Sequence, residues 1–352
     1  MKNIHGEILV YGPNWIGDAI MSIPALKAIK KSFPDSFLHV LAVPWVKDIY
    51  DLSGIPDNII CYDRRLKHRG LKGIARLTAK IKQLNISTAI ILPNSWRSAL
   101  IPWIAGIPIR VGLSVRYREY FFFSHSSKPE KDFKSRHQVF YYLSIVKILC
   151  PEIDKYEKEV TKTPLFLPYA EKPVLAELAR RFGLNLNKPW LALAPGAQYG
   201  DAKLWWPENF SQVARRVAKE FGAQVVIFGS DADTAVARQI ATNADTDFII
   251  LTGKTSLKEA IVLLGNCRAL LTNDSGLMHV GAAIGVPLVA IFGSTDPVHT
   301  GPFGDPTKTI VLESKVDCHP CLKPECPHGH KRCMTEISPE ETFDSVKQLW
   351  EK

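Results

Sequence analysis

The segment from Ala269 to Pro297 places groups that can bind an anion at the end of a predicted strand. Residues 269–272 form a short apolar run, and the Asn-Asp-Ser-Gly turn that follows leads into a helix of small residues. The start of a helix offers N–H groups and the positive end of its dipole to a phosphate, and Gly276 lets a ligand approach the backbone closely. The turn is therefore either a phosphate-binding half-site or an ordinary helix start capped by Asp274 or Ser275.

The elements that must position this turn alternate along the whole chain. Short apolar strands followed by helical patterns are typical of parallel sheets with helices on both faces. In the first half we expect strands at residues 8–11, 38–42 and 89–92 and helices at 18–33, 70–84 and 137–149. In the second half we expect strands at 190–194, 224–228, 248–251, 269–272 and 288–292 and helices at 207–221, 233–243, 257–266 and 339–350. The predicted fold class is α/β, with two Rossmann-like domains facing each other across a cleft.

The length and composition of the chain suit a two-domain globular enzyme. At 352 residues it exceeds the usual size of a single core, and 46% hydrophobic with 22% charged residues are ordinary values for such a protein. The sequence contains no run of about 18 apolar residues, which a membrane-spanning helix would need. Its first residues do not have the pattern of an export signal. We therefore expect a cytoplasmic protein, in which the seven cysteines are more readily thiols or metal ligands than disulfides.

Positive charge is concentrated in the first half of the chain. Residues 1–170 contain 25 Lys and Arg against 14 Asp and Glu, whereas the remaining residues contain 19 against 21. Such a distribution favours an anionic partner, namely nucleic acid, a phosphorylated substrate or an acidic membrane face. A basic surface that only keeps the protein soluble is the alternative.

Two common nucleotide-binding motifs are absent from the sequence. The segment from Gly12 to Asp18 is not a P-loop, because no Gly-Lys-Ser/Thr follows it, and neither half carries Gly-x-Gly-x-x-Gly at a strand–helix turn. These absences argue against kinases, ATPases and dehydrogenases.

Three islands of sequence match one family in their order and spacing. They are GPNWIGDAIMSIPALKAIKKSFP, PGAQYGDAKLWWPENF and TNDSGLMHVGAAIGVPLVAIFGSTDP. Together they resemble the lipopolysaccharide heptosyltransferases of glycosyltransferase family nine, and the tail CHPCLKPECPHGHKRCM is similar to that of members that add the second heptose. The resemblance implies a GT-B fold with an acceptor-binding domain (residues 1–165), a nucleotide-sugar domain (166–338) and a final helix (339–352) that could pack back on the first domain.

The resemblance also implies a reaction and a base for it. These enzymes transfer L-glycero-D-manno-heptose from ADP-heptose to the lipopolysaccharide core, with inversion at the anomeric carbon. Direct displacement requires a group that accepts the proton of the acceptor hydroxyl, and Asp18 matches the family's catalytic aspartate. The other interpretation is that Asp18 only caps the first helix. Asn14 and Trp15 are expected on the acceptor side.

The resemblance places the donor site in the second half of the chain. Its expected residues are Lys203, Asp231, Thr255, Asp274, Ser275, Gly276 and His279. The lysine matches the family's phosphate-binding lysine, the first aspartate an acidic position that contacts the ribose, and the threonine a backbone contact to adenine. Asp231 stands where relatives can carry Glu, so its reach is shorter. Taken singly, a loop lysine is usually solvated, and a histidine on a helix of small residues is usually packed in the core.

The tail contains four cysteines at a spacing that suits zinc. Cys318, Cys321, Cys326 and Cys333 lie in one segment, the Cys-rich loop (residues 318–333), with three histidines among them. Four thiolates on one loop can bind Zn²⁺ and order a segment that lacks regular structure. Three arrangements are open: a structural zinc site, reduced thiols packed in the loop, or a disulfide. The implied reaction requires no cofactor in any of them.

The expected partners are ADP-heptose and a lipid A–Kdo/heptose acceptor, met by a peripheral protein at the inner face of the inner membrane. Neither a nucleic-acid partner nor a transmembrane segment is expected. One alternative is a GT-B transferase with another nucleotide-sugar donor or another acceptor. The second alternative is a zinc-containing nucleic-acid-binding protein, which the charge and the Cys/His tail favour. That alternative leaves the Gly-Asp and Asn-Asp-Ser-Gly turns without a purpose.

Overall fold

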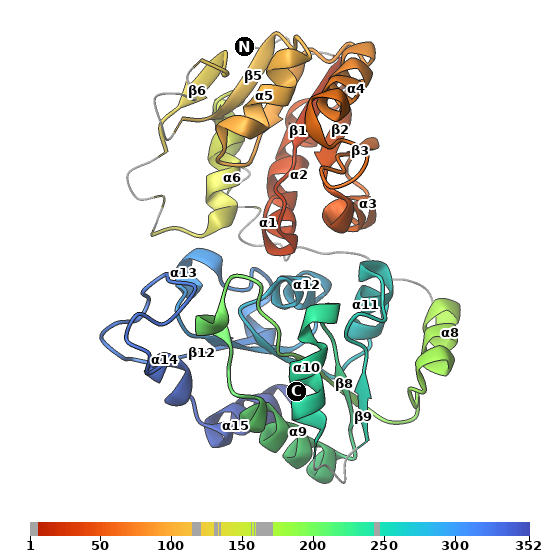
Figure 1. Ribbon diagram of the computed structural model, residues 1–352, viewed down its shortest axis with the longest axis vertical. Helices are drawn as coiled ribbons and strands as arrows, with labels where there is room; N and C mark the ends of the chain where they lie inside the picture. Colours follow the sequence, from red (N-terminus) through yellow and green to blue (C-terminus); the bar gives the residue numbers. More distant parts are fainter. Residues whose placement is uncertain are drawn as a thin grey trace. The chain divides into compact units, whose positions relative to one another are not determined.

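The computed structural model describes residues 6–114, 121–129, 133, 135–155, 157, 159, 172–242 and 247–352. The chain divides into two compact units, Met1–Thr163 and Pro164–Lys352. The sequence placed this boundary two residues later, between residues 165 and 166, and both positions lie outside the described residues. Each unit is an α/β structure built on one parallel sheet (Figure 1).

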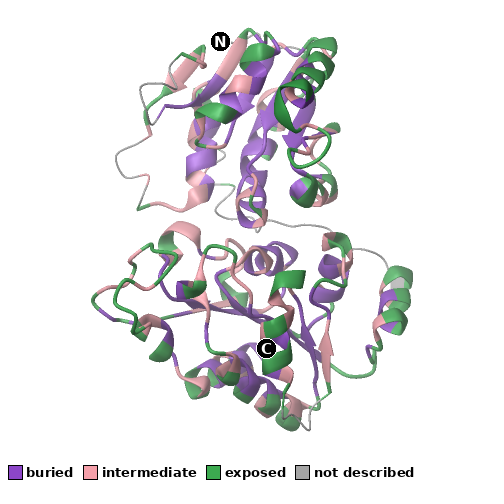
Figure 2. Cartoon of the chain, in the orientation of Figure 1, coloured by how far each residue is buried: buried purple, intermediate pink, exposed green. Residues whose placement is uncertain are grey.

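The first unit contains a six-stranded sheet in the order β3-β2-β1-β4-β5-β6. The strands are β1 (Glu7–Tyr11), β2 (Phe37–Ala42), β3 (Asn58–Cys61), β4 (Thr88–Ile91), β5 (Ile109–Leu113) and β6 (His125–Ser127). Every pairing is parallel, and in the centre Val10 lies between Val40 and Ile90. Strands buried on both faces need apolar side chains throughout, which explains why β1 is nearly a continuous apolar run (Figure 2).

Helices connect these strands and cover the sheet. They are α1 (Ile16–Met21), α2 (Ile23–Ser32), α3 (Lys47–Ser53), α4 (Gly70–Gln83), α5 (Trp96–Ile104) and α6 (Gln138–Lys147), with short 3₁₀ turns at Pro44–Val46 and Pro151–Ile153. The single helix predicted at 18–33 is two helices that meet at Ser22. Pro24 explains the break, because it lacks an N–H and its ring clashes with the carbonyl four residues earlier.

The second unit repeats this plan with the sheet order β12-β11-β10-β7-β8-β9. Its strands are β7 (Trp190–Ala194), β8 (Gln224–Ile227), β9 (Phe248–Ile250), β10 (Ala269–Asn273), β11 (Leu288–Phe292) and β12 (Thr309–Glu313). Its helices are α8 (Lys172–Phe182), α9 (Pro207–Phe221), α10 (Thr234–Ala241), α11 (Leu257–Leu264), α12 (Gly276–Ile284), α13 (Pro297–Thr300), α14 (Arg332–Thr335) and α15 (Pro339–Trp350), with 3₁₀ turns at Asp201–Lys203, Asp231–Asp233 and Pro306–Lys308.

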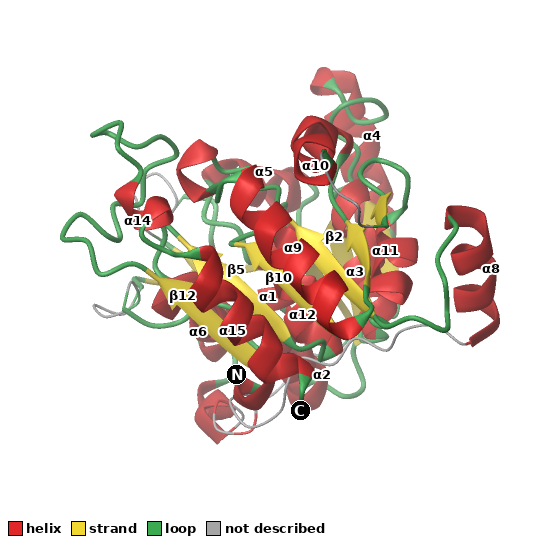
Figure 3. Cartoon of the chain, turned by 90° about the horizontal axis from the view of Figure 1, so that it is seen from below, coloured by secondary structure: helices red, strands yellow, loops and turns green. Residues whose placement is uncertain are grey.

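The final helix α15 packs within the second unit. It lies beside α9 over β10, β11 and β12 (Figure 3). Phe343, Val346 and Leu349 belong to the same buried cluster as Leu193 of β7. The apolar face of this helix is therefore buried in the core of its own unit.

The strand order of each sheet reverses beside its first strand. In the first unit the chain runs from β1 outward to β3 and then returns to β4 on the other side of β1. In the second unit it runs from β7 outward to β9 and returns to β10 on the other side of β7. Ligands of open α/β sheets bind at the carboxyl ends of the strands at such a reversal. The loops after β1, β7 and β10 are therefore the places to look for function.

Candidate active site

The predicted donor residues all follow the carboxyl ends of strands in the second sheet. Lys203 follows β7, Asp231 follows β8, Thr255 follows β9 and Asp274 follows β10. Because every pairing in this sheet is parallel, these ends lie along one edge. The two residues after the adjacent central strands β7 and β10 are in direct contact.

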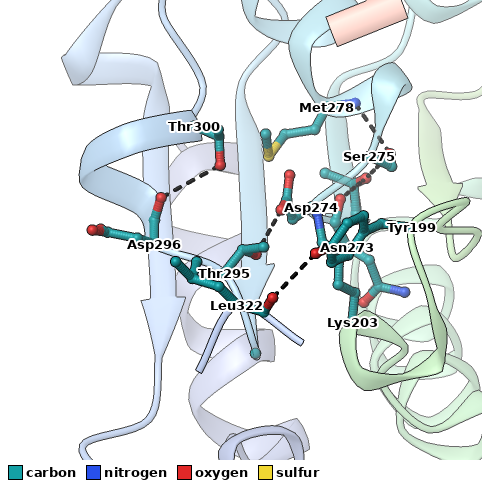
Figure 4. Close-up of polar contacts among 12 residues, drawn as sticks. Tyr199, Lys203, Asn273, Asp274, Ser275, Met278, Thr295, Asp296, Thr300 and Leu322 are labelled. Carbon is teal, nitrogen blue, oxygen red and sulfur yellow. Dashed lines mark hydrogen bonds and ion pairs between the residues drawn. The ribbon is translucent and has the colours of Figure 1, made fainter. Parts of the chain in front are cut away.

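Lys203 and Asp274 form a buried ion pair at the reversal between β7 and β10. Lys203 Nζ lies 2.5 Å from Asp274 Oδ2, and the two side chains are 12% and 5% exposed. Thr295, which follows β11, donates its hydroxyl to the same carboxylate oxygen at 2.6 Å (Figure 4). The lysine is therefore held by its surroundings rather than extended into solvent, and the pair places a fixed cation where an anionic ligand is expected.

The turn after β10 acts as a helix cap and also has the features of an anion site. Ser275 is the N-cap of α12, and its Oγ accepts a hydrogen bond from the Met278 N–H at 3.4 Å. The N–H groups of the first helical turn, which starts at Gly276, have no acceptor within the helix, so capping by a side chain and binding of an anion are compatible. His279 follows one turn later on the same helix and is 5% exposed.

Asn273 joins the two loops that carry this ion pair. Its side-chain amide donates to the Pro195 carbonyl at 2.6 Å, and its Oδ1 accepts from the Trp205 N–H at 3.3 Å. Trp205 is itself buried, and its indole N–H donates to the Ile337 carbonyl at 3.1 Å. The loop between β7 and α9 is thus anchored on both sides of Lys203.

Asp231 and Thr255 lie on two neighbouring loops of the same edge. Asp231 begins the 3₁₀ turn after β8 and is exposed. Gly253, in the loop after β9, has a φ of +69°, and a side chain there would lie 3.0 Å from Asp231 Oδ1. Thr255 follows two residues later and is half-buried. Only a glycine fits where these two loops approach each other. The predicted ribose contact, Asp231, and the predicted adenine contact, Thr255, therefore lie on adjacent loops.

Asp18 lies in the first turn of α1, the helix that follows the central strand β1. The N-cap of α1 is Trp15, so the interpretation of Asp18 as the helix cap is wrong. The Tyr142 hydroxyl donates to Asp18 Oδ1 at 3.0 Å. The carboxylate is half-buried and is held in one orientation by a side chain from α6.

Two buried tyrosines surround this carboxylate. Burial first and the Asp18 charge second raise the pKa of Tyr142 well above its usual range, and burial likewise raises the pKa of Tyr50. Both hydroxyls therefore stay protonated, and Tyr142 remains a donor. The Tyr50 hydroxyl lies 3.1 Å from Ser22 Oγ. A Cβ atom at position 12 would lie 2.6 Å from the same hydroxyl, so only glycine fits there. No motif in the sequence singled out either tyrosine. Tyr142 belongs to an aromatic pair within the predicted helix 137–149, and Tyr50 lies in no predicted element.

The predicted acceptor-side residues lie in the loop after β1. Trp15 is 55% exposed, while Asn14 is half-buried and its carbonyl accepts a hydrogen bond from Trp45 Nε1 at 2.6 Å. Arg65 lies over the Trp45 ring, 5.1 Å from its centroid. The first unit thus presents aromatic and basic side chains around the loop between β1 and α1.

The Cys-rich loop follows β12 at the same edge as the donor residues. All seven cysteines are free thiols, and the four in this loop line one small pocket with His328 and His330. Among the described residues, no group of three or more His, Cys, Asp or Glu side chains is arranged to hold a metal ion. The zinc prediction is therefore not supported by the geometry. Backbone N–H groups, that of Lys331 foremost, lower the pKa of the Cys326 thiol.

None of the helices in the described part of the chain combines the length and the apolar character needed to cross a bilayer.

Comparison with known proteins identifies close relatives of the whole chain. Residues 74–332 match the family described as glycosyltransferase family 9 (heptosyltransferase). The chain is 30% identical to lipopolysaccharide heptosyltransferase 2 of Salmonella typhimurium, across 97% of this chain and 98% of that protein. It superimposes on the structure of ADP-heptose lps heptosyltransferase II of E. coli with a TM-score of 0.80 and 26% identity, covering 98% of both chains. A family 9 glycosyl transferase from Veillonella parvula shares the fold, with a TM-score of 0.87 at 24% identity and coverage of 100% and 99%.

Proposed function

Because the chain belongs to glycosyltransferase family 9, the heptosyltransferases, we propose that it transfers L-glycero-D-manno-heptose from ADP-heptose to the inner core of lipopolysaccharide, as the second heptose. The similarity to heptosyltransferase 2 proteins over nearly the full chain supports this acceptor. The observation that carries the proposal is the Lys203 ammonium, fixed beside the start of α12 at the reversal of the second sheet. A diphosphate leaving group matches this combination of a cation and a helix N-terminus.

The proposed reaction is a single displacement. Asp18 accepts the proton of the acceptor hydroxyl, and the hydroxyl oxygen forms a bond to C1 of the heptose. The bond from C1 to the diphosphate oxygen breaks, ADP leaves with the electron pair, and the configuration at C1 inverts. Tyr142 keeps the Asp18 carboxylate oriented, while Lys203 stabilises the negative charge that develops on ADP. Neither role calls for a metal ion or another cofactor.

The remaining donor residues have supporting roles in this proposal. Asp231 accepts hydrogen bonds from the ribose hydroxyls, and the Thr255 backbone contacts the adenine. The proximity of their two loops supports this division, because ribose and adenine are adjacent in the nucleotide. Asp274 and His279 line the donor site.

A transfer assay with a graded set of acceptors tests the proposed specificity. We expect product from ADP-heptose with an inner core that carries one heptose, and little or none with cores that carry zero or two. A preference for the heptose-free core would assign the first transfer instead. Efficient transfer from a different nucleotide sugar would favour the alternative GT-B transferase.

We further propose that the protein works at the cytoplasmic face of the inner membrane, where such an acceptor is anchored. An exposed aromatic cluster on the first unit supports this location. Trp103 at the end of α5 and Phe121 are 41% and 71% exposed, with ring centroids 5.9 Å apart, and Trp96 stacks on Phe122 beside them at 6.1 Å. Aromatic rings of this kind favour the interface between lipid and water, and the basic first half complements acidic lipids.

Vesicle binding tests this location. The double variant Trp103→Ser/Phe121→Ser is expected to bind vesicles of phosphatidylglycerol and phosphatidylcholine about tenfold more weakly than the wild type, because two exposed rings no longer enter the interface. Leu186→Ser, which removes an apolar side chain of the second unit that is 52% exposed, is the matched control and should bind normally. Equal flotation of all three proteins would show that the aromatic cluster does not meet the membrane.

A further inference from the structure

The Cys-rich loop is fastened to the segment that carries Lys203. The Tyr199 hydroxyl donates to the Leu322 carbonyl at 3.1 Å, and the Ala202 N–H donates to the Pro324 carbonyl at 3.1 Å. A third contact joins Lys331 Nζ to Asp201 Oδ2 at 2.8 Å. Tyr199 lies just before the 3₁₀ turn Asp201–Lys203, and the other two contacts are made by residues of the turn itself, so the path of this turn depends on the loop.

The same loop is fastened to the turn that supports Asp274. The Leu322 N–H donates to the Ser294 carbonyl at 2.7 Å. The next residue, Thr295, donates to Asp274 Oδ2 at 2.6 Å. Leu322 therefore bonds through its N–H to the turn after β11, and its carbonyl accepts from the Tyr199 hydroxyl (Figure 4). Its φ of 56° is unusual for a residue with a side chain, and this left-handed conformation turns its two peptide groups toward those two partners.

The Tyr199 ring and the Asp274 carboxylate together position the lysine. Lys203 Nζ lies 5.0 Å from the centroid of the Tyr199 ring and 2.5 Å from Asp274 Oδ2. A cation over an aromatic face is attracted by the ring quadrupole. Tyr199 bonds directly to the Cys-rich loop at Leu322. Asp274 is linked to the loop through Thr295 and the adjacent Ser294.

We propose that the Cys-rich loop positions Lys203 for the donor diphosphate, with Tyr199 as the positioning residue between them. This inference rests on the proposed function in one respect, which is that Lys203 binds the diphosphate. A lysine side chain has four rotatable bonds, and holding it in place before the ligand arrives removes part of the ordering cost of binding. The loop thus acts on donor affinity although it supplies no group to the reaction.

Two substitutions at Tyr199 separate the hydroxyl from the ring. Tyr199→Phe keeps the ring and removes only the bond to Leu322, and it should raise the Kd for ADP about three- to tenfold. Tyr199→Leu removes both contacts and should raise this Kd further. The KM for ADP-heptose should rise in parallel, while kcat and the KM for the acceptor stay within about twofold. Lys331→Met, which breaks the contact with Asp201, should produce the same selective change.

The controls distinguish this inference from general destabilisation and from failure of the proposed function. Lys323→Ala changes an exposed residue of the same loop and should leave the Kd for ADP unchanged. If Tyr199→Phe and Tyr199→Leu bind ADP normally while Lys203→Ala does not, the positioning role is refuted and the phosphate role stands. If Lys203→Ala also binds ADP normally, the phosphate role itself fails. A Tyr199 variant that lowers kcat and raises both KM values equally would indicate a purely structural role and overturn the inference.

Discussion

Asp18→Asn is expected to reduce heptose transfer by about 100- to 10,000-fold, the range associated with the loss of a general base. The amide has nearly the same shape as the carboxylate and can still accept the hydrogen bond from the Tyr142 hydroxyl. It cannot accept the proton of the acceptor hydroxyl. The measurement is the initial rate of transfer from ADP-heptose at saturating acceptor, together with the Kd for ADP-heptose by titration calorimetry.

The affinity for the donor should hardly change in this variant, because the donor residues belong to the other unit. Asp35→Asn, at an exposed position of the first unit, is the matched control and should retain full activity. Turnover near that of the wild type in Asp18→Asn would eliminate Asp18 as the base. A parallel loss of donor affinity would instead point to a change of fold.

Lys203→Ala is expected to raise the Kd for ADP and for ADP-heptose by about 10- to 150-fold, since a charge-assisted hydrogen bond contributes about 1.5–3 kcal/mol. The variant also leaves Asp274 without its cation. Asp274 is only 5% exposed, and removing one partner of a buried pair costs about 3–5 kcal/mol of folding stability. Thermal unfolding must therefore be measured beside ligand binding.

A double variant separates these two effects. Lys203→Met/Asp274→Asn removes both charges, so it should recover much of the lost stability without recovering affinity for ADP. Lys219→Ala, which changes an exposed lysine of α9, should alter neither quantity. Normal ADP titrations for a folded Lys203→Ala protein would refute the phosphate role.

The alternation of strands and helices could be predicted from the sequence where the apolar runs are long. The strands Trp190–Ala194 and Leu288–Phe292 and the helix Pro207–Phe221 have the predicted bounds, because turn residues mark both of their ends. The strands β3, β5, β6 and β12 were not predicted. In β6 the residues are His, Ser and Ser, and such a strand is specified by its neighbour rather than by its own side chains.

The positions of the site residues were predictable, but their partners were not. A strand followed by Gly-Asp or Asn-Asp-Ser-Gly predicts a loop at the carboxyl edge of a sheet, and the structure places Asp18 and Asp274 there. The hydrogen bond from Tyr142 to Asp18 spans 124 residues, and the bond from Tyr199 to Leu322 spans 123. No local pattern encodes such contacts, because they arise from tertiary packing.

Because β1 and β7 are central strands, the residues assigned to the transfer chemistry lie apart from the loops assigned to nucleotide recognition. A strand paired on both sides is the hardest part of a sheet to displace, and the residues assigned to the chemistry follow these two strands. The loops assigned to ribose and adenine follow β8 and β9, toward one margin of the second sheet. Insertions or substitutions in those outer loops can change which nucleotide is accepted while the proton acceptor and the phosphate ligand stay in place. Proteins that share this fold can therefore differ in the nucleotide sugar they accept while keeping the same transfer chemistry.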